Sequence, residues 1–223
     1  MQLYILPAKM PPASVLDLYN ASFELWESVW FETLQELDGI QALHSDAFTL
    51  QDFFAVVVLD QKPAALCCFK MLDLRLQSHQ KDSWLAPWPK SLIGEIAKTH
   101  PQALIPSWLS VHADYRKSSG FQGVNLALVM SEMISLVCLE VGADIAFGTP
   151  RKDRSVNKLV YQAGATCLAE DVSHHGVLVD LVSFDPKNLR LRIFSTDTQK
   201  LWQQRLDMTN KKPQKDLRYE SRL

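Results

Sequence analysis

Residues 106–123 read PSWLSVHADYRKSSGFQG, and this stretch decides how the rest of the chain is interpreted. Its first part predicts a strand that ends at His112. Its second part is a polar turn with two glycines, and apolar residues at helical spacing follow as far as Val141. Where a strand turns into a helix in this way, unpaired backbone N–H groups lie at the positive end of the helix dipole. The stretch therefore predicts an anion site, most naturally for phosphate.

The chain after this helix continues the same alternation of strand and helix. Residues 144–147 predict a short strand, and a strand reached through a helix on one side implies a parallel partner. A second helix is expected to end at Ala163, before Gly164. Residues 166–171 and 176–182 then alternate about a polar turn, which predicts a closing hairpin.

The chain before the turn predicts a strand, a long helix and a hairpin. Residues 3–6 form a short apolar run, and residues 15–37 carry apolar and aromatic side chains at helical spacing before Gly39. We interpret this aromatic stripe as a core face rather than a ligand surface. Residues 53–59 and 64–72 are apolar runs joined by a tight polar turn, which predicts an antiparallel hairpin.

Two segments fit this regular pattern less well. Residues 73–104 mix charges, prolines and two tryptophans without a strong period, which is long for a connection inside a compact domain. We interpret them as an insertion and a candidate lid over a ligand cleft. Beyond residue 184 we expect an edge strand over 189–194, a short helix over 198–206 and disorder from 210 onward. The predicted organisation is one domain over 1–184 and a partly disordered C-terminal extension over 185–223.

Composition limits the function classes. Hydrophobic residues make up 47% and charged residues 22%, which is ordinary for a soluble globular protein. The net charge of −2 does not favour nucleic-acid binding. Residues 185–223 nevertheless hold ten Lys or Arg against five Asp or Glu. We interpret this basic tail as solvated, with binding to RNA or an anionic surface as the alternative.

The cysteines and the N-terminal residues indicate the cellular compartment in which the protein is expected. The four cysteines lie in apolar runs or singly, which favours free thiols in a reducing environment over disulfides or a metal framework. The adjacent His174 and His175 supply too few ligands for a metal site. No secretory signal pattern is present, and no apolar run approaches the roughly 18 to 20 residues of a membrane span. A cytoplasmic protein without a membrane span is expected.

Two motifs resemble the GCN5-related N-acetyltransferase (GNAT) superfamily. Residues 111–116, VHADYR, resemble the start of its acyl-CoA pocket, which commonly reads Val-x-Pro-x-Tyr-Arg and continues as Arg/Gln-x-x-Gly-x-Gly/Ala into a helix. Residues 158–165, KLVYQAGA, are similar to its Leu-Tyr-x-Lys-x-Gly-Phe motif. The resemblance covers about residues 1–184. It implies an α/β (α+β) fold, with a GNAT-like mixed central β-sheet flanked by helices, an insertion before the central strand and a basic tail.

The resemblance also implies an activity. A GNAT-like N-acyltransferase moves an acyl group from a thioester to an amine acceptor, with acetyl-CoA or a longer acyl-CoA as substrate and no metal. The tryptophans of the insertion favour a longer chain. Counted from Arg116, Ser119 and Phe121 stand where the family has glycine, so an acyl-carrier protein is an alternative donor. A catalytically degenerate, CoA-binding or regulatory domain is the alternative function.

The resemblance assigns site residues on the matching positions. Main-chain groups of Leu109 and Val111 would hold the thioester carbonyl, and Asn157 would contact pantetheine. Tyr161 would protonate the leaving thiolate, since a phenol with a pKa near ~10 is a suitable acid; a core tyrosine is the alternative. His112 is a candidate base, with an exposed polar residue as the alternative. The expected pyrophosphate contacts are Arg116, Lys117, Ser118, Ser119, Gly120, Phe121, Gln122 and Gly123.

Overall fold

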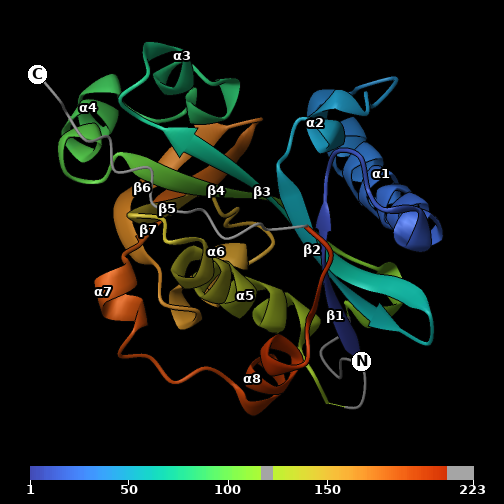
Figure 1. Ribbon diagram of the computed structural model, residues 1–223. Helices are drawn as coiled ribbons and strands as arrows, with labels where there is room; N and C mark the ends of the chain where they lie inside the picture. Colours follow the sequence, from blue (N-terminus) through green and yellow to red (C-terminus); the bar gives the residue numbers. More distant parts are fainter. Residues whose placement is uncertain (117–122, 210–223) are drawn as a thin grey trace, which may run out of the picture.

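The protein is described here by a computed structural model, which covers residues 1–116 and 123–209. Eight strands within these residues form one sheet in the order β6-β7-β5-β4-β3-β2-β1-β8 (Figure 1). Neighbouring strands are antiparallel except for the parallel pairs β4–β5 and β1–β8. The strands are β1 (Gln2–Pro7), β2 (Phe53–Leu59), β3 (Lys62–Asp73), β4 (Gln102–Val111), β5 (Ile145–Gly148), β6 (Thr166–His174), β7 (Val177–Phe184) and β8 (Leu206–Asp207).

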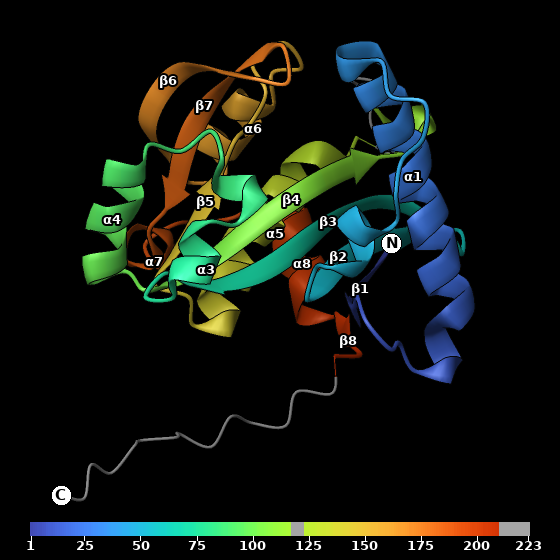
Figure 2. The ribbon, with the colours of Figure 1, turned by 90° about the horizontal axis from the view of Figure 1, so that it is seen from above.

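Helices cover both faces of this sheet, which confirms the predicted mixed sheet flanked by helices (Figures 1 and 2). The long helix α1 packs on one face, and α5 packs on the other together with α8. The α-helices are α1 (Leu16–Asp38), α2 (Asp46–Thr49), α3 (Gln77–Gln80), α4 (Lys90–Thr99), α5 (Leu126–Val141), α6 (Val156–Gln162), α7 (Pro186–Leu189) and α8 (Thr196–Gln203). The described part of the chain also contains the short 3₁₀ turns η1 (Ala13–Val15), η2 (Ser83–Leu85) and η3 (Ala113–Tyr115).

The aromatic stripe of α1 forms a core, as the sequence predicts. Trp26 is fully buried and packs against Phe48 and Phe54, with ring centroids of Trp26 and Phe48 5.4 Å apart. Cys68 of β3 closes the same cluster from the sheet. Burial of side chains of this size contributes about 1.5 to 3 kcal/mol each, so this cluster fixes α1 firmly on β2 and β3.

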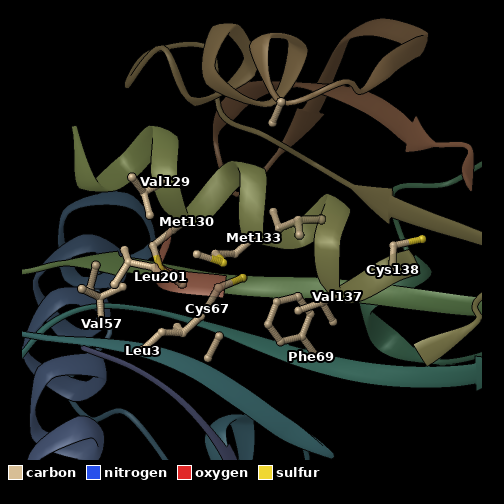
Figure 3. Close-up of a cluster of buried hydrophobic side chains, with 14 of the residues drawn as sticks. Leu3, Val57, Cys67, Phe69, Val129, Met130, Met133, Val137, Cys138 and Leu201 are labelled. Atoms are coloured by element: carbon tan, nitrogen blue, oxygen red, sulfur yellow. The ribbon is translucent and has the colours of Figure 1, made fainter. Parts of the chain in front are cut away.

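The second core lies between α5 and the opposite face of the sheet (Figure 3). Met130, Met133 and Val137 project from α5 toward Cys67 and Phe69 of β3. The helix ends at Gly142, whose φ of 67° is left-handed and whose N–H bonds the carbonyl of Cys138. A glycine adopts that conformation without a Cβ penalty, which confirms the C-cap predicted from the sequence.

The hairpins and the insertion position the central strands. The hairpins β2–β3 and β6–β7 are both antiparallel, and β5 is parallel to β4, as predicted. In the insertion, Trp88 is buried and its ring lies 4.9 Å from that of Phe147 on β5. The insertion therefore has a hydrophobic cluster of its own against β5, and its role as a lid stays a prediction.

The C-terminal extension differs from the expected one. The predicted edge strand over 189–194 is wrong, because Asp185 caps the short helix α7 and the loop that follows leaves Leu191 and Ile193 almost fully exposed. The edge is formed instead by β8, which pairs with β1. The predicted short helix is present as α8. The predicted disorder from 210 onward lies outside the described residues, and the boundary at 184 stays a prediction.

Candidate active site

The parallel strands β4 and β5 pair over only a short distance. Their register joins Ala103 to Ile145 and Leu104 to Ala146. Beyond these pairs β4 continues to Val111, whereas β5 pairs with β7 on its other side. Within residues 1–116 and 123–209, no strand pairing bridges the far half of β4 to β5. The far half of β4 thus has β3 along one edge only, and its other edge faces the gap between the two halves of the sheet.

The far half of β4 also contains a β-bulge. The register with β3 shifts between Leu66 and Cys68, so that Trp108 and Leu109 together lie opposite Cys67. Trp108 has a φ of 58°, which is unusual for a residue that is not glycine. The bulge changes the alternation of side chains, because a strand inverts its faces when one residue is added. Leu104 faces the α5 core before the bulge, and Leu109 and Val111 face it afterwards.

The residues at the end of β4 fold back on the strand. Arg116 donates from Nε to the carbonyl oxygen of Val111 at 2.7 Å, and its Nη1 lies 4.0 Å from the Glu32 carboxylate of α1. His112 accepts a hydrogen bond at Nδ1 from the backbone N–H of Asp114 at 3.3 Å. The same Nδ1 lies 3.6 Å from the carboxylate Oδ2 of Asp114. The predicted role of His112 as a base stays a prediction.

The predicted phosphate turn is described only at its two ends. Lys117, Ser118, Ser119, Gly120, Phe121 and Gln122 lie outside the described residues. Gly123 has a φ of 84° and an open space where a side chain would stand. The helix α5 begins later than predicted, at Leu126, because the Asn125 side chain caps it by accepting from the N–H of Leu128 at 3.1 Å. A single cap satisfies one of the free N–H groups at a helix start and leaves others available.

The opposite side of the gap carries a buried carboxylate. Asp180 of β7 has a side chain that is only 2% exposed. Its Oδ2 accepts from the Tyr161 hydroxyl at 2.6 Å and from Asn157 Nδ2 at 3.0 Å, both on α6. The backbone N–H of Asp171 donates to Oδ1 at 3.3 Å, and Lys152 Nζ lies 3.6 Å away. Two of the predicted site residues, Asn157 and Tyr161, are therefore brought together by one carboxylate.

This arrangement shifts the pKa of both partners. Burial by itself would raise the pKa of Asp180, but hydrogen bonds from Tyr161 and Asn157 favour the charged form and leave that pKa below its usual value. Burial, followed by the hydrogen bond to Asp180, raises the pKa of Tyr161 well above its usual value. The phenol therefore holds its proton more tightly than a free tyrosine, and that proton is directed at Asp180.

Sequence reasoning missed Asp180, although a signal was present. The residue interrupts the apolar run VLVDLV over 177–182. A carboxylate in such a run is costly to bury without partners. Reading the run that way would have predicted hydrogen-bond donors nearby. The side-chain oxygen Oδ1 of Asn157 remains buried without a partner among the described residues.

Two polar contacts connect the end of α1 to the other half of the molecule. Glu36 accepts from Arg154 at 2.7 Å, and Asp38 lies 2.7 Å from Nδ1 of His175 at the β6–β7 turn. Figure 2 shows this end of α1 close to the β6–β7 hairpin. Burial, followed by repulsion from neighbouring His175, lowers the pKa of His174. These contacts lie on the surface that joins the two halves of the sheet.

The mixed sheet, in which β4 and β5 pair only over their first residues, is the fold of solved acyltransferase structures. The resemblance expected from the sequence is thus confirmed at the level of the fold.

Solved structures share this fold over most of the chain. The AHL synthase LasI matches with a TM-score of 0.58 and 14% identity, over 92% of this chain and 95% of that chain. BjaI, described as a CoA-dependent acyl-homoserine lactone synthase, matches with a TM-score of 0.55 and 12% identity, over 92% of both chains. FeeM, an N-acyl amino acid synthase from uncultured soil microbes, matches with a TM-score of 0.55 and 13% identity, over 80% of this chain and 97% of that chain. No family model and no curated sequence matches.

Among residues 1–116 and 123–209, no three His, Cys, Asp or Glu side chains gather as they would around a metal ion. No helix in the described part of the chain combines the length and apolarity needed to cross a bilayer. Cys67, Cys68 and Cys138 are buried free thiols, as the sequence predicts, and burial raises the pKa of Cys67 to about 12.

Proposed function

We propose that the protein is an N-acyltransferase that moves an acyl group from an acyl thioester to an amine. The observation that carries this proposal is the far half of β4, which has a bulge and an edge left unpaired by β5, directly before the predicted phosphate turn. Backbone N–H groups at such an edge can hold a thioester carbonyl, and preorganised donors of this kind stabilise the oxyanion of acyl transfer.

The reaction follows from these positions. The amine attacks the thioester carbon, and the carbonyl oxygen becomes an oxyanion held by N–H groups near Leu109 and Val111. The carbon–sulfur bond then breaks, the amide forms, and the proton lost by the amine balances the proton taken by the thiolate. Tyr161 is the proposed proton donor. Its hydroxyl donates a hydrogen bond to Asp180 Oδ2, so the phenol must turn from Asp180 to the sulfur.

The donor is proposed to be acyl-CoA, with an acyl-carrier protein as the alternative. Both present a pantetheine arm with two amide groups. The buried Oδ1 of Asn157 lacks a donor among the described residues, and an amide N–H of pantetheine would satisfy it. Arg116, Gly123 and the residues between them remain the proposed contacts for the phosphates. The amine acceptor is proposed as a small molecule, and the protein is proposed to act in the cytoplasm.

A thiol-release assay tests this proposal. Purified protein is given acyl-CoA of chain lengths from acetyl to palmitoyl, and the same acyl groups on acyl-carrier protein, each with a panel of amines that includes amino acids. We expect thiol release that depends on both an acyl donor and an amine, with an amide product detected by mass spectrometry. Calorimetry with CoA gives an independent measure of donor binding.

The outcomes separate the proposed enzyme from its alternative. CoA binding without turnover of any donor would favour a catalytically degenerate CoA-binding domain. If the protein neither binds CoA nor turns over any donor, the proposed enzyme and the CoA-binding domain are both contradicted.

A pair of variants tests the proposed pantetheine contact. The variant Asn157→Ala should weaken CoA binding, whereas Asn188→Ala, at an exposed position on α7, should leave it unchanged.

A further inference from the structure

The bulge in β4 is held from the α1 side by a chain of two hydrogen bonds. The indole Nε1 of Trp30 donates to Ser110 Oγ at 3.0 Å, and Ser110 Oγ donates to the carbonyl oxygen of Trp108 at 3.0 Å. A serine hydroxyl has one donor and can also accept, so both bonds are made at once. Ser110 is completely buried. We call these three residues the Trp30–Ser110–Trp108 chain.

The Trp30–Ser110–Trp108 chain acts on a strained residue. Trp108 holds a φ of 58°, and a residue with a side chain in that region costs about 1 to 3 kcal/mol unless its surroundings impose it. Trp108 is held by aromatic contacts as well as by hydrogen bonds. The Trp108 ring packs edge-on against Trp30 at 4.8 Å and against Trp26 at 5.7 Å between centroids. The long helix α1 thus fixes both the ring and the carbonyl of the bulged residue.

Fixing this carbonyl also fixes the next N–H. In a trans peptide the carbonyl of one residue and the N–H of the next point in opposite directions. The Trp108 carbonyl points to Ser110 Oγ, so the N–H of Leu109 points away from it. Leu109 lies on the half of β4 whose outer edge is not paired with β5. Its N–H is one of the groups to which the proposed reaction assigns the thioester carbonyl.

We infer that Trp30 and Ser110 are positioning residues for acyl transfer: they hold the 108–109 peptide so that the Leu109 N–H is preorganised for the developing oxyanion. This inference rests on the proposed function. Neither residue touches the reacting atoms. Both act through the backbone of β4, and a preorganised donor contributes more than one that must reorient during the reaction.

The protein contains a matched control residue for each of the two substitutions that test this inference. Trp30→Phe keeps an aromatic ring and removes the N–H that bonds Ser110. Trp26→Phe makes the same change on the same helix, next to the same Trp108 ring, but the Nε1 of Trp26 has no hydrogen-bond partner among the described residues. Ser110→Ala removes the middle of the chain. Ser22→Ala removes a hydroxyl that is equally buried but bonds the Leu18 carbonyl of its own helix.

Two measurements are made on all four variants and the wild type. The first is NMR of protein labelled with ¹⁵N at leucine and tryptophan, which reads the Leu109 amide shift and the H–N–Cα–H coupling that reports φ of Trp108. The second is the steady-state rate of the acyl transfer found for the wild type. We expect Trp30→Phe and Ser110→Ala to change both NMR signals and to lower kcat about 10- to 100-fold with KM for the donor unchanged. The two controls should leave the NMR signals and kcat near the wild-type values.

The NMR signals and the steady-state rate can each contradict the inference independently of the other. Unchanged NMR signals in both test variants would overturn the inference, whatever happens to activity. Altered signals with unchanged kcat would show that the Trp30–Ser110–Trp108 chain shapes the bulge without serving catalysis, and would overturn the positioning role. If the wild type turns over no thioester, the proposed function fails and the catalytic role falls with it, while the NMR comparison still decides whether the chain holds the peptide. If Trp30→Phe does not fold, Ser110→Ala provides the same test.

Discussion

The two sides of the gap between β4 and β5 are held by different kinds of hydrogen bond. On the β4 side, neutral donors and acceptors fix the backbone, with Trp30 and Ser110 bonded to the carbonyl of Trp108. On the other side, the charged side chain of Asp180 holds Tyr161 and Asn157. A neutral hydrogen bond contributes about 0.5 to 1.5 kcal/mol, and one to a charged group about 1.5 to 3. The hydrogen bonds of Trp30, Ser110 and Trp108 should therefore be insensitive to pH, whereas those of Asp180 should depend on it.

The largest effect is expected from removing the carboxylate. Asp180→Ala leaves the Tyr161 hydroxyl and Asn157 Nδ2 without their acceptor and Lys152 with one carboxylate fewer. Breaking a buried charged network by deleting one member typically costs about 3 to 5 kcal/mol. We expect the free energy of unfolding in urea to fall by about 3 kcal/mol.

The matched control is Asp171→Ala. Asp171 also pairs with Lys152, at 2.6 Å, but its side chain is 55% exposed, and exposed pairs contribute about 1 kcal/mol or less. If both variants lose the same small amount of stability, the carboxylate of Asp180 is not the organising group and the contrast between the two sides of the gap is wrong.

The second prediction concerns acid. The pKa of Asp180 is lowered in the folded protein, so its contribution to stability is complete above the unfolded-state pKa, about 3.9, and is lost as the pH falls through the folded-state value. We expect the wild type to lose stability below about pH 4 more steeply than Asp180→Asn does. Ser110→Ala should keep the wild-type slope, because the hydrogen bonds that it removes join only uncharged groups. Urea unfolding from pH 7 to pH 2.5 checks this, and equal slopes in wild type and Asp180→Asn would contradict it.

The fold could be predicted from the sequence because its signals are local. The apolar runs of β2 and β3 are separated by a tight turn, and Gly39 and Gly142 both end their helices in the left-handed conformation. Each signal depends on neighbouring residues and backbone geometry alone. The edge strand β8 had no such signal, because it is two residues long and is defined only by its pairing with β1.

The candidate site could be predicted in part. The motif at 158–165 directed attention to Tyr161, which bonds the buried Asp180, and Asn157 lies one turn before it on α6. Their common partner is 19 residues or more away in sequence. The bond between Trp30 and Ser110 spans 80 residues. Contacts of this kind follow from how α1 and α6 pack on the sheet, so no local pattern could have indicated them.

The smallest effect is expected where the end of α1 meets the β5–α6 loop. Arg154 donates to Glu36 at 2.7 Å, and the two side chains are 55% and 60% exposed. An exposed pair of this kind contributes about 0.2 to 1 kcal/mol and is screened by salt. We expect Glu36→Arg and Arg154→Glu each to reduce stability by about 0.5 kcal/mol or somewhat more, and the double exchange to restore it at low salt.

Urea unfolding of the two single variants and the double variant gives the coupling energy between the two positions. A coupling energy near zero at 1 M salt would agree with a screened surface pair. A coupling clearly above 1 kcal/mol that persists in salt would mean that the two sides of the gap are mechanically joined through α1, and they could then no longer be treated as independent.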